Sequence, residues 1–177
     1  MRRYAIAGLL FLFLTSCMAG IEKPVAPVVP QDTNKENGLT NAKYSIDELC
    51  KEVLAGIAGK DRKLLETMSL TEDELKRYIW PYSEWSKPEV RMPFEFYRGD
   101  LHQKSSFALN GILAKYGGIK FEFVSVRFAK DILTYQNARV HNGARITVRD
   151  EQGRVGEIKM FGSVFELNGQ YKIFSYK

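Results

Sequence analysis

The sequence predicts an α+β fold in which helices come first and an antiparallel sheet follows. Apolar residues recur with helical spacing between residues 46 and 113. From residue 119 the apolar period changes to two, and turn residues separate the alternating segments. This order predicts N-terminal helices, one of them long, packed on a curved antiparallel sheet of about five strands.

The first 17 residues predict export. Arg2 and Arg3 precede an apolar run over 4–13, which is too short for a membrane span of about 20 residues. A basic start, a short apolar run and small residues are typical of a secretory signal. The segment ends in Leu14-Thr15-Ser16-Cys17, which resembles the lipobox of bacterial lipoproteins. The alternative is a buried apolar helix that happens to precede a cysteine.

The lipobox resemblance implies a signal peptide over residues 1–16 and a lipid on Cys17, which becomes the new N-terminus. In two-membrane bacteria, an aspartate directly after that cysteine resembles the signal for retention in the inner membrane. Here the next residue is Met18. The resemblance therefore implies a lipid-anchored protein of the cell envelope, in the outer membrane and facing the periplasm.

Residues 17–44 are expected to be a lipidated cysteine followed by a flexible tether. Pro24, Pro27 and Pro30 precede a polar run over 31–38, and no helix or strand period is present. A flexible segment of this length spans roughly 30 Å on average. Residues 45–177 remain, and they suffice for one domain with one core.

Composition narrows the function classes. The chain has 26 basic and 21 acidic residues, and 24 basic residues remain once Arg2 and Arg3 leave with the signal. This small excess of basic residues, without a basic tract, does not support nucleic-acid binding. Cys50 is the only cysteine besides Cys17, and no metal-ligand spacing surrounds it. We therefore expect neither a metal nor a cofactor.

Two capping boxes predict helix starts. Ser45 with Glu48 predicts a helix from residue 46, whose apolar face includes Cys50 and which ends at Gly59. A short helix with Leu64, Leu65 and Met68 on its buried side follows. Thr71 with Glu74 predicts a third helix, which Pro81 ends.

The connector from Trp80 to Trp85 is unusually aromatic. The two indoles could form the rim or lid of a pocket, because each has a polar N–H and a broad apolar face. They could equally fill the gap between two helices, and we favour that interpretation.

The long helix is expected from about Pro93 to Gly117. Arg98 and His102 are four residues apart on one face, while Asp100 and Lys104 form a surface pair on another. If the face of Arg98 and His102 looks into a cavity, these side chains, with Tyr97, could bind an acid group. The alternative is a solvated charged face.

The strand pattern predicts turns and registers. The change of parity near Phe123 and Val124 indicates a β-bulge. A second strand over 132–140 is expected to turn back at His141-Asn142-Gly143, which would place Arg139, Arg145 and Arg149 on one possible partner face. A turn over 151–153 would bring Ile158 opposite Ile146, and Asn168-Gly169 predicts a last hairpin.

Residues 45–177 resemble the NTF2-like (cystatin-like) superfamily, in which a curved sheet wraps a long helix into a cone. The final hairpin over 161–176 carries this resemblance, and the stretch over 96–105 is similar to uncharacterised bacterial proteins. The enzymes of that superfamily place an acid or histidine base at the mouth of the cone. His141 is expected at the tip of a turn, which argues against its acting as such a base. Glu166 is expected next to a hairpin, and this position is no more suitable for a base.

Three kinds of function follow. The expected one is a non-catalytic binding or assembly module, whose partner is an envelope protein or a small ligand. A second is a structural envelope protein that works through the outer sheet face of Arg139, Arg145 and Arg149. The alternative is a small-molecule carrier, or an isomerase or dehydratase built on Tyr97, Asp100 or His102. The candidate pocket residues are Tyr97, Arg98, His102, Trp80 and Trp85.

Overall fold

The computed structural model describes residues 38–177, which belong to one compact unit. The predicted signal peptide, Cys17 and the tether up to residue 37 lie outside the described residues. Within residues 38–177, no helix has the length and apolar character needed to cross a membrane.

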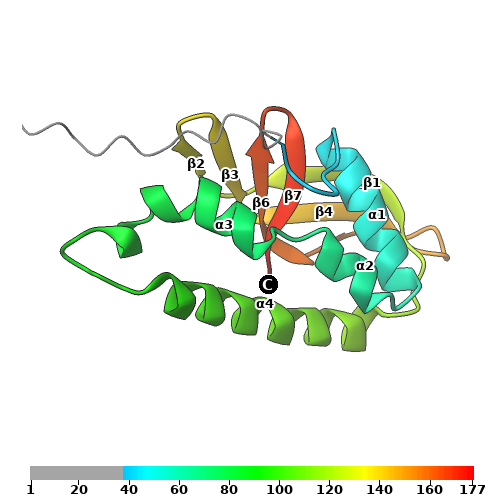
Figure 1. The fold of residues 1–177 in the computed structure, drawn as a ribbon. Helices are drawn as coiled ribbons and strands as arrows, with labels where there is room; N and C mark the ends of the chain where they lie inside the picture. Colours follow the sequence, from blue (N-terminus) through cyan, green and yellow to red (C-terminus); the bar gives the residue numbers. More distant parts are fainter. Residues whose placement is uncertain (1–37) are drawn as a thin grey trace, which may run out of the picture. The chain divides into compact units, whose positions relative to one another are not determined.

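The α+β class and the order of elements are confirmed (Figure 1). The helices are α1 (Ile46–Ala58), α2 (Arg62–Thr67), α3 (Glu72–Tyr78) and α4 (Phe94–Tyr116), with short 3-10 turns η1 (Trp80–Tyr82) and η2 (Glu84–Ser86) before α4. The strands are β1 (Glu122–Phe128), β2 (Ile132–Tyr135), β3 (Ala138–Asn142), β4 (Ala144–Arg149), β5 (Val155–Ile158), β6 (Phe161–Leu167) and β7 (Gln170–Tyr176).

The predicted helix starts are confirmed by their caps. The Ser45 hydroxyl accepts a hydrogen bond from the backbone N–H of Glu48 at 3.1 Å. At α3 the box is reciprocal: Thr71 Oγ1 accepts from the Glu74 N–H, and the Glu74 carboxylate accepts from the Thr71 N–H. Pro93 precedes α4, and Gly117 follows it. Local side-chain hydrogen bonds thus fix these helix ends.

The strands form two antiparallel sheets instead of one. One sheet has the order β1-β4-β5 and the other the order β2-β3-β6-β7, and they do not close into a barrel. The prediction of a single sheet of about five strands is therefore wrong in its count and division. The expected strand over 132–140 is also two strands, β2 and β3, separated by a turn at Gln136, which has φ 51°.

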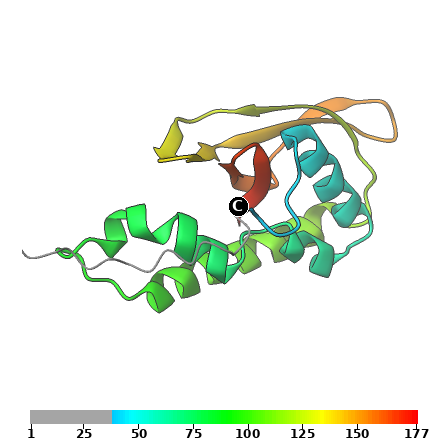
Figure 2. The same cartoon turned by 45° about the horizontal axis from the view of Figure 1, so that its top comes forward.

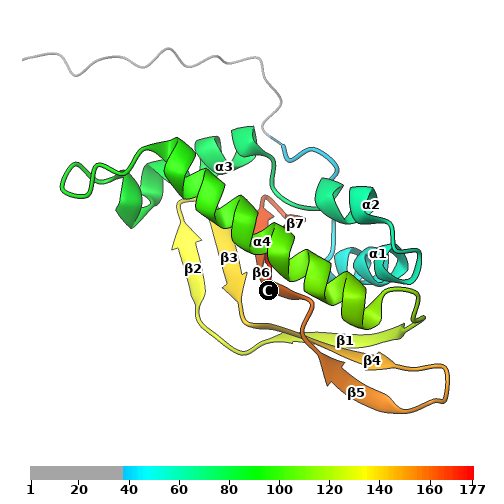
Figure 3. The same ribbon diagram turned by 90° about the horizontal axis from the view of Figure 1, so that it is seen from below.

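The predicted turn at His141-Asn142-Gly143 is wrong. β3 pairs with β2 and β6, whereas β4 pairs with β1 and β5, so β3 and β4 do not form a hairpin. Gly143 has φ 74°, but it bends one continuing strand from the β2-β3-β6-β7 sheet into the β1-β4-β5 sheet. Its N–H donates to the Gly162 carbonyl at 2.8 Å, and its carbonyl accepts from the Ala129 N–H at 3.0 Å. Three neighbouring strands thus bend together where the sheets meet (Figure 3).

Other local predictions are confirmed. The β1–β4 register shifts between Phe123 and Ser125, at the expected bulge. Ile146 lies opposite Ile158, and the last hairpin turns at Asn168-Gly169, where both residues have positive φ. These features depend on two neighbouring strands and their turn, and such local patterns are readable from sequence.

The core has two parts. The larger part joins α1, α2 and the second half of α4 to both sheets, and includes Leu49, Val53, Ile57, Ile146 and Val164. The smaller part lies between α3, the start of α4 and the β2-β3-β6-β7 sheet, and includes Leu75, Ile79, Phe94, Val140 and Phe165. Figure 2 shows α1 against the sheet that contains β1, with α4 running past α2 and α3.

Two expectations about the core have different outcomes. Cys50 is fully buried, as predicted, and burial together with the neighbouring Asp47 carboxylate raises the pKa of its thiol to about 12. The apolar pattern of the long helix and of the strands also predicts that Leu101, Phe121, Phe123 and Ile158 are buried together, and this prediction is wrong. Leu101 packs with the smaller part of the core, and the other three pack against the larger part.

Candidate functional site

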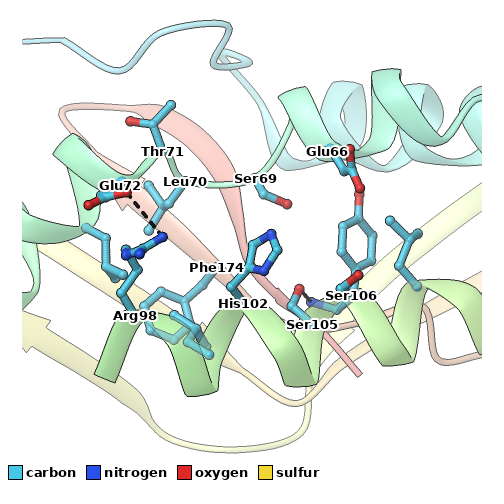
Figure 4. A pocket seen from close by; sticks show the side chains of 14 residues that line it. Glu66, Ser69, Leu70, Thr71, Glu72, Arg98, His102, Ser105, Ser106 and Phe174 are labelled. Atoms are coloured by element: carbon cyan, nitrogen blue, oxygen red, sulfur yellow. Dashed lines mark hydrogen bonds and ion pairs between the residues drawn. The ribbon is translucent and has the colours of Figure 1, made fainter. Parts of the chain in front are cut away.

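A pocket of about 290 Å³ lies between α4, the α2–α3 segment and the end of β7, and we call it the α4 pocket. Helix α4 contributes Arg98, Leu101, His102, Ser105, Ser106 and Leu109. The segment opposite contributes Glu66, Ser69, Leu70, Thr71, Glu72 and Leu75, and β7 contributes Phe174 and Tyr176 (Figure 4). Apolar and polar side chains therefore both line the pocket, which suits an amphipathic ligand.

Arg98 is the strongest binding group in the α4 pocket. One terminal nitrogen, Nη1, lies 3.2 Å from Oε2 of Glu72. Its Nε atom is buried and has no hydrogen-bond partner among the described residues. An unpaired buried N–H is energetically costly, so this donor favours an incoming acceptor.

His102 lies one helical turn after Arg98 on the same face of α4, as the sequence predicts. It lines the α4 pocket, and Figure 4 shows its imidazole beside Ser69. An imidazole can donate from one nitrogen while the other accepts. Together with Arg98, it supplies donors at one end of the pocket.

The other end of the α4 pocket is held by a small hydrogen-bond network. The Ser105 hydroxyl accepts from the Tyr176 N–H at 3.0 Å, and the Ser106 hydroxyl accepts from Arg62 at 2.7 Å. The Tyr176 hydroxyl donates to the Leu65 carbonyl at 2.6 Å, and burial raises the pKa of this phenol. These bonds fix the wall formed by α4 and β7.

The remaining candidate pocket residues lie elsewhere. Tyr97 packs against Trp80, with 5.4 Å between ring centroids, and Trp80 lies 5.5 Å from Phe94 by the same measure. Burial is the larger cause that raises the pKa of Tyr97, and the nearby Tyr135 raises it further. Trp85 is 48% exposed in η2. Trp80 thus fills space between helices. The α4 pocket is lined by none of these three residues, Trp80, Tyr97 and Trp85.

The three arginines of the expected partner face are each paired with a carboxylate. Arg145 and Arg149 lie on β4, where Arg145 Nε is 3.6 Å from Glu157 and Arg149 Nε is 3.2 Å from Glu122. Arg139 lies on β3, in the other sheet, and pairs with Glu166. The three arginines are not aligned across one pair of strands, because β3 and β4 do not form the hairpin that would align them.

The structure also places His141 differently from the sequence prediction. His141 lies within β3, with its side chain 10% exposed, and not at a turn tip. Its Nε2 atom is 2.6 Å from Oε2 of Glu166, whose other oxygen bonds to Arg139. Both partners are on adjacent strands, so the pair links β3 to β6.

A second buried ion pair was not predicted. Lys172 on β7 is fully buried, and its Nζ donates to Oε2 of Glu74 on α3 at 2.7 Å. The N–H and hydroxyl of Thr40 donate to the other oxygen, Oε1, at 2.7 and 3.0 Å. Glu74 thus joins α3, β7 and the chain segment before α1. Only its role in the capping box was visible in the sequence.

The environment holds this pair in its charged form. Burial alone would raise the pKa of Glu74, but the hydrogen bonds from Lys172, the Thr71 N–H and the Thr40 N–H outweigh it and keep the pKa below its usual value. Burial lowers the pKa of Lys172, and the contact with Glu74 offsets part of that effect.

Residues 38–177 contain no group of three or more histidine, cysteine or acidic side chains placed to hold a metal ion. Comparison with protein-family models, with curated proteins and with solved structures finds no significant match to this chain.

Proposed function

We propose that this chain is a lipid-anchored protein of the bacterial cell envelope whose domain is a non-catalytic binding module. Its ligand is a small amphipathic molecule with an acid group, held in the α4 pocket. The observation that carries this proposal is the Nε atom of Arg98, which is buried and has no hydrogen-bond partner among the described residues, in a pocket that apolar side chains also line.

The chemistry of the pocket favours an acid. A guanidinium presents paired N–H groups that match the two oxygens of a carboxylate, and such charge-assisted bonds are the strongest kind. His102 and Ser69 add donors beside it. Leu70, Leu101 and Phe174 offer apolar contact for the rest of the ligand.

The volume limits the ligand. At about 290 Å³ the α4 pocket lies at the lower end of the usual range for small-molecule sites. A short aliphatic or single-ring acid fits that space better than a long-chain lipid.

Binding is favoured over catalysis because the candidate catalytic residues do not meet. Asp100 pairs with Lys104 at 2.7 Å on an exposed face, and Tyr97 packs against Trp80. Acid–base catalysis needs a group positioned within hydrogen-bond reach of the substrate and a partner that orients it. Within residues 38–177, the hydrogen bond between a histidine and a carboxylate joins His141 to Glu166, away from the α4 pocket.

The finer fold proposal is an NTF2-like cone. Helices that precede a bent antiparallel arrangement, with α4 packed across it, support this proposal. A fold of this kind hosts many functions, so the binding proposal depends on the pocket and not on the fold.

The binding proposal can be tested with residues 36–177, the compact unit, and a panel of short aliphatic and aromatic acids. At least one acid should raise the unfolding midpoint, and the Arg98→Met variant should abolish the shift. Arg154→Met, which changes charge on an exposed turn, is the matched control and should keep the full shift. A panel that leaves the midpoint unchanged, or an Arg98→Met variant that still responds, would refute the proposed ligand class.

The anchoring proposal has its own test. Metabolic labelling with a palmitate analogue should label the native chain and not the Cys17→Ser variant. Fractionation of a two-membrane bacterium should find the native protein in the outer membrane. Full labelling of the variant would contradict the lipobox interpretation, and protein only in the inner membrane would contradict the proposed location.

A further inference from the structure

A second hollow, of about 360 Å³, lies at the bend between the two sheets. Four cationic residues line it: Lys130, Arg145, Lys159 and Lys177. The other lining groups are neutral, and they include the side chains of Asn142, Ser163 and Ser175. No acidic side chain lines this hollow, which we call the basic hollow.

Within the described part of the chain, the four cations of the basic hollow have one ion-pair contact among them. Lys130, Lys159 and Lys177 form no ion pair within the described part of the chain, whereas Arg145 has a single long contact of 3.6 Å to Glu157. Glu157 is also bound by Arg127, at 2.6 Å, so its charge is shared. Like charges gathered in one concavity repel each other and focus a positive potential that attracts anions.

The fold brings these residues together from four separate places. Lys130 follows β1, Arg145 is on β4, Lys159 precedes β6 and Lys177 follows β7. Two glycines allow the close approach. A Cβ on Gly143 would lie 2.9 Å from Cγ of Lys130, and a Cβ on Gly162 would lie 3.0 Å from Cβ of Lys177. The lysine stems therefore lie against bare backbone at the bend.

Neutral polar groups in the hollow are already ordered. The Ser163 hydroxyl donates to Oδ1 of Asn142 at 2.8 Å, and Nδ2 of Asn142 donates to the Asp131 carbonyl at 3.1 Å. Ser175 forms no side-chain hydrogen bond with another described residue and can donate to a bound anion.

We propose that the basic hollow binds a phosphate-bearing ligand. Several cations around one site exceed what a single carboxylate needs, and they match the higher charge of a phosphate group. Lysine ammonium groups bind phosphate as mobile point charges, and serine hydroxyls add neutral donors. The site is separate from the α4 pocket, and the two share no lining residue.

The basic hollow continues into a neighbouring depression, so the site is larger than one phosphate group needs. Lys159 and Lys177 also line an adjoining depression, together with Lys115 at the end of α4 and one carboxylate, Glu157 on β5. A ligand with a phosphate and a further anionic group could contact both. The phosphate could belong to a soluble molecule or to a lipid head group, and the test separates these sources.

The test uses residues 36–177, whose core and buried ion pairs lie within the described unit. Two probes are measured near physiological ionic strength: inorganic pyrophosphate by calorimetry, and phosphatidylglycerol vesicles by co-sedimentation, with phosphatidylcholine vesicles as the uncharged reference. Saturable binding of pyrophosphate supports a soluble ligand, and binding to phosphatidylglycerol vesicles alone supports a lipid head group. No saturable binding of either probe would overturn the proposal.

A charge-matched pair of variants tests the location. Lys130→Gln/Lys159→Gln should weaken binding at least tenfold, because each ammonium contributes a charge-assisted contact. Lys87→Gln/Lys104→Gln removes the same net charge from two exposed pairs on other elements and should change the affinity less than twofold. Equal losses in both double variants would show that only the net charge matters and would overturn the assigned site. Circular dichroism checks that all variants are folded.

Discussion

At the scale of single residues, Glu74 links three parts of the chain, and the sequence reveals only its role in the cap of α3. It closes the cap of α3, accepts from the fully buried Lys172 and accepts from Thr40. A buried ion pair contributes little net stability, because desolvation opposes the attraction between the charges. Removing one partner is different, since it leaves a buried charge without compensation.

We therefore predict that Lys172→Met lowers the free energy of unfolding by about 3–5 kcal/mol. The double variant Lys172→Met/Glu74→Gln should be more stable than Lys172→Met alone, because no buried charge remains unpaired. Urea unfolding measures both. Lys104→Met, at an exposed pair, is the control and should change stability by no more than about 0.5 kcal/mol. A loss below about 1 kcal/mol for Lys172→Met would mean that the lysine reaches water.

At the scale of secondary-structure elements, the bend at Gly143 decides the architecture. The residue has φ 74°, and a Cβ there would lie 3.2 Å from the Lys130 backbone nitrogen in addition to its side-chain contact. Positive φ is readily accessible to glycine and costly for other residues. A residue with a side chain would therefore strain the point at which β3 passes into β4.

Gly143→Ala should accordingly lower the free energy of unfolding by about 1–3 kcal/mol. Gly156→Ala is the matched control, since Gly156 lies in β5 with ordinary φ and nothing within 4 Å of a Cβ. That control should be neutral or slightly stabilising. Chemical denaturation of the two variants measures the difference, and equal midpoints would show that the bend tolerates a side chain.

At the scale of the whole domain, acid stability should depend on Glu74. Its pKa in the folded state is lowered, against about 4.3 in an unfolded chain. Between those two values the unfolded state binds more protons, so stability rises with pH. The contribution of Glu74 is fully present above about pH 4.3 and is lost as the pH falls through its folded-state pKa.

The measurement is the free energy of unfolding from pH 2 to pH 6. Glu74→Gln should flatten the acid limb of this profile relative to the native domain, because the variant has no proton to take up at that position. Glu84→Gln, whose side chain is 79% exposed, should leave the slope unchanged. If the slope were the same in the native domain and Glu74→Gln, the lowered pKa would not contribute to stability.

The sequence by itself determined the features that depend on neighbours along the chain. The helix starts at Ser45 and Thr71, the long helix after Pro93, the bulge near Phe123 and the turn at Asn168-Gly169 are all confirmed. Each depends on a cap, a turn or an apolar period within a few residues. The sequence also placed Arg98 and His102 on one face of α4, because helical geometry fixes that spacing.

Only the tertiary structure decided which strands pair and which side chains share a site. The same glycine can turn a hairpin or bend a continuing strand, and the choice at Gly143 depends on partners more than ten residues away. That choice separates Arg139 from Arg145, buries His141 against Glu166 and gathers the lysines of the basic hollow. Long-range pairing lowers the free energy through burial across the whole sheet, and a local sequence pattern does not encode it.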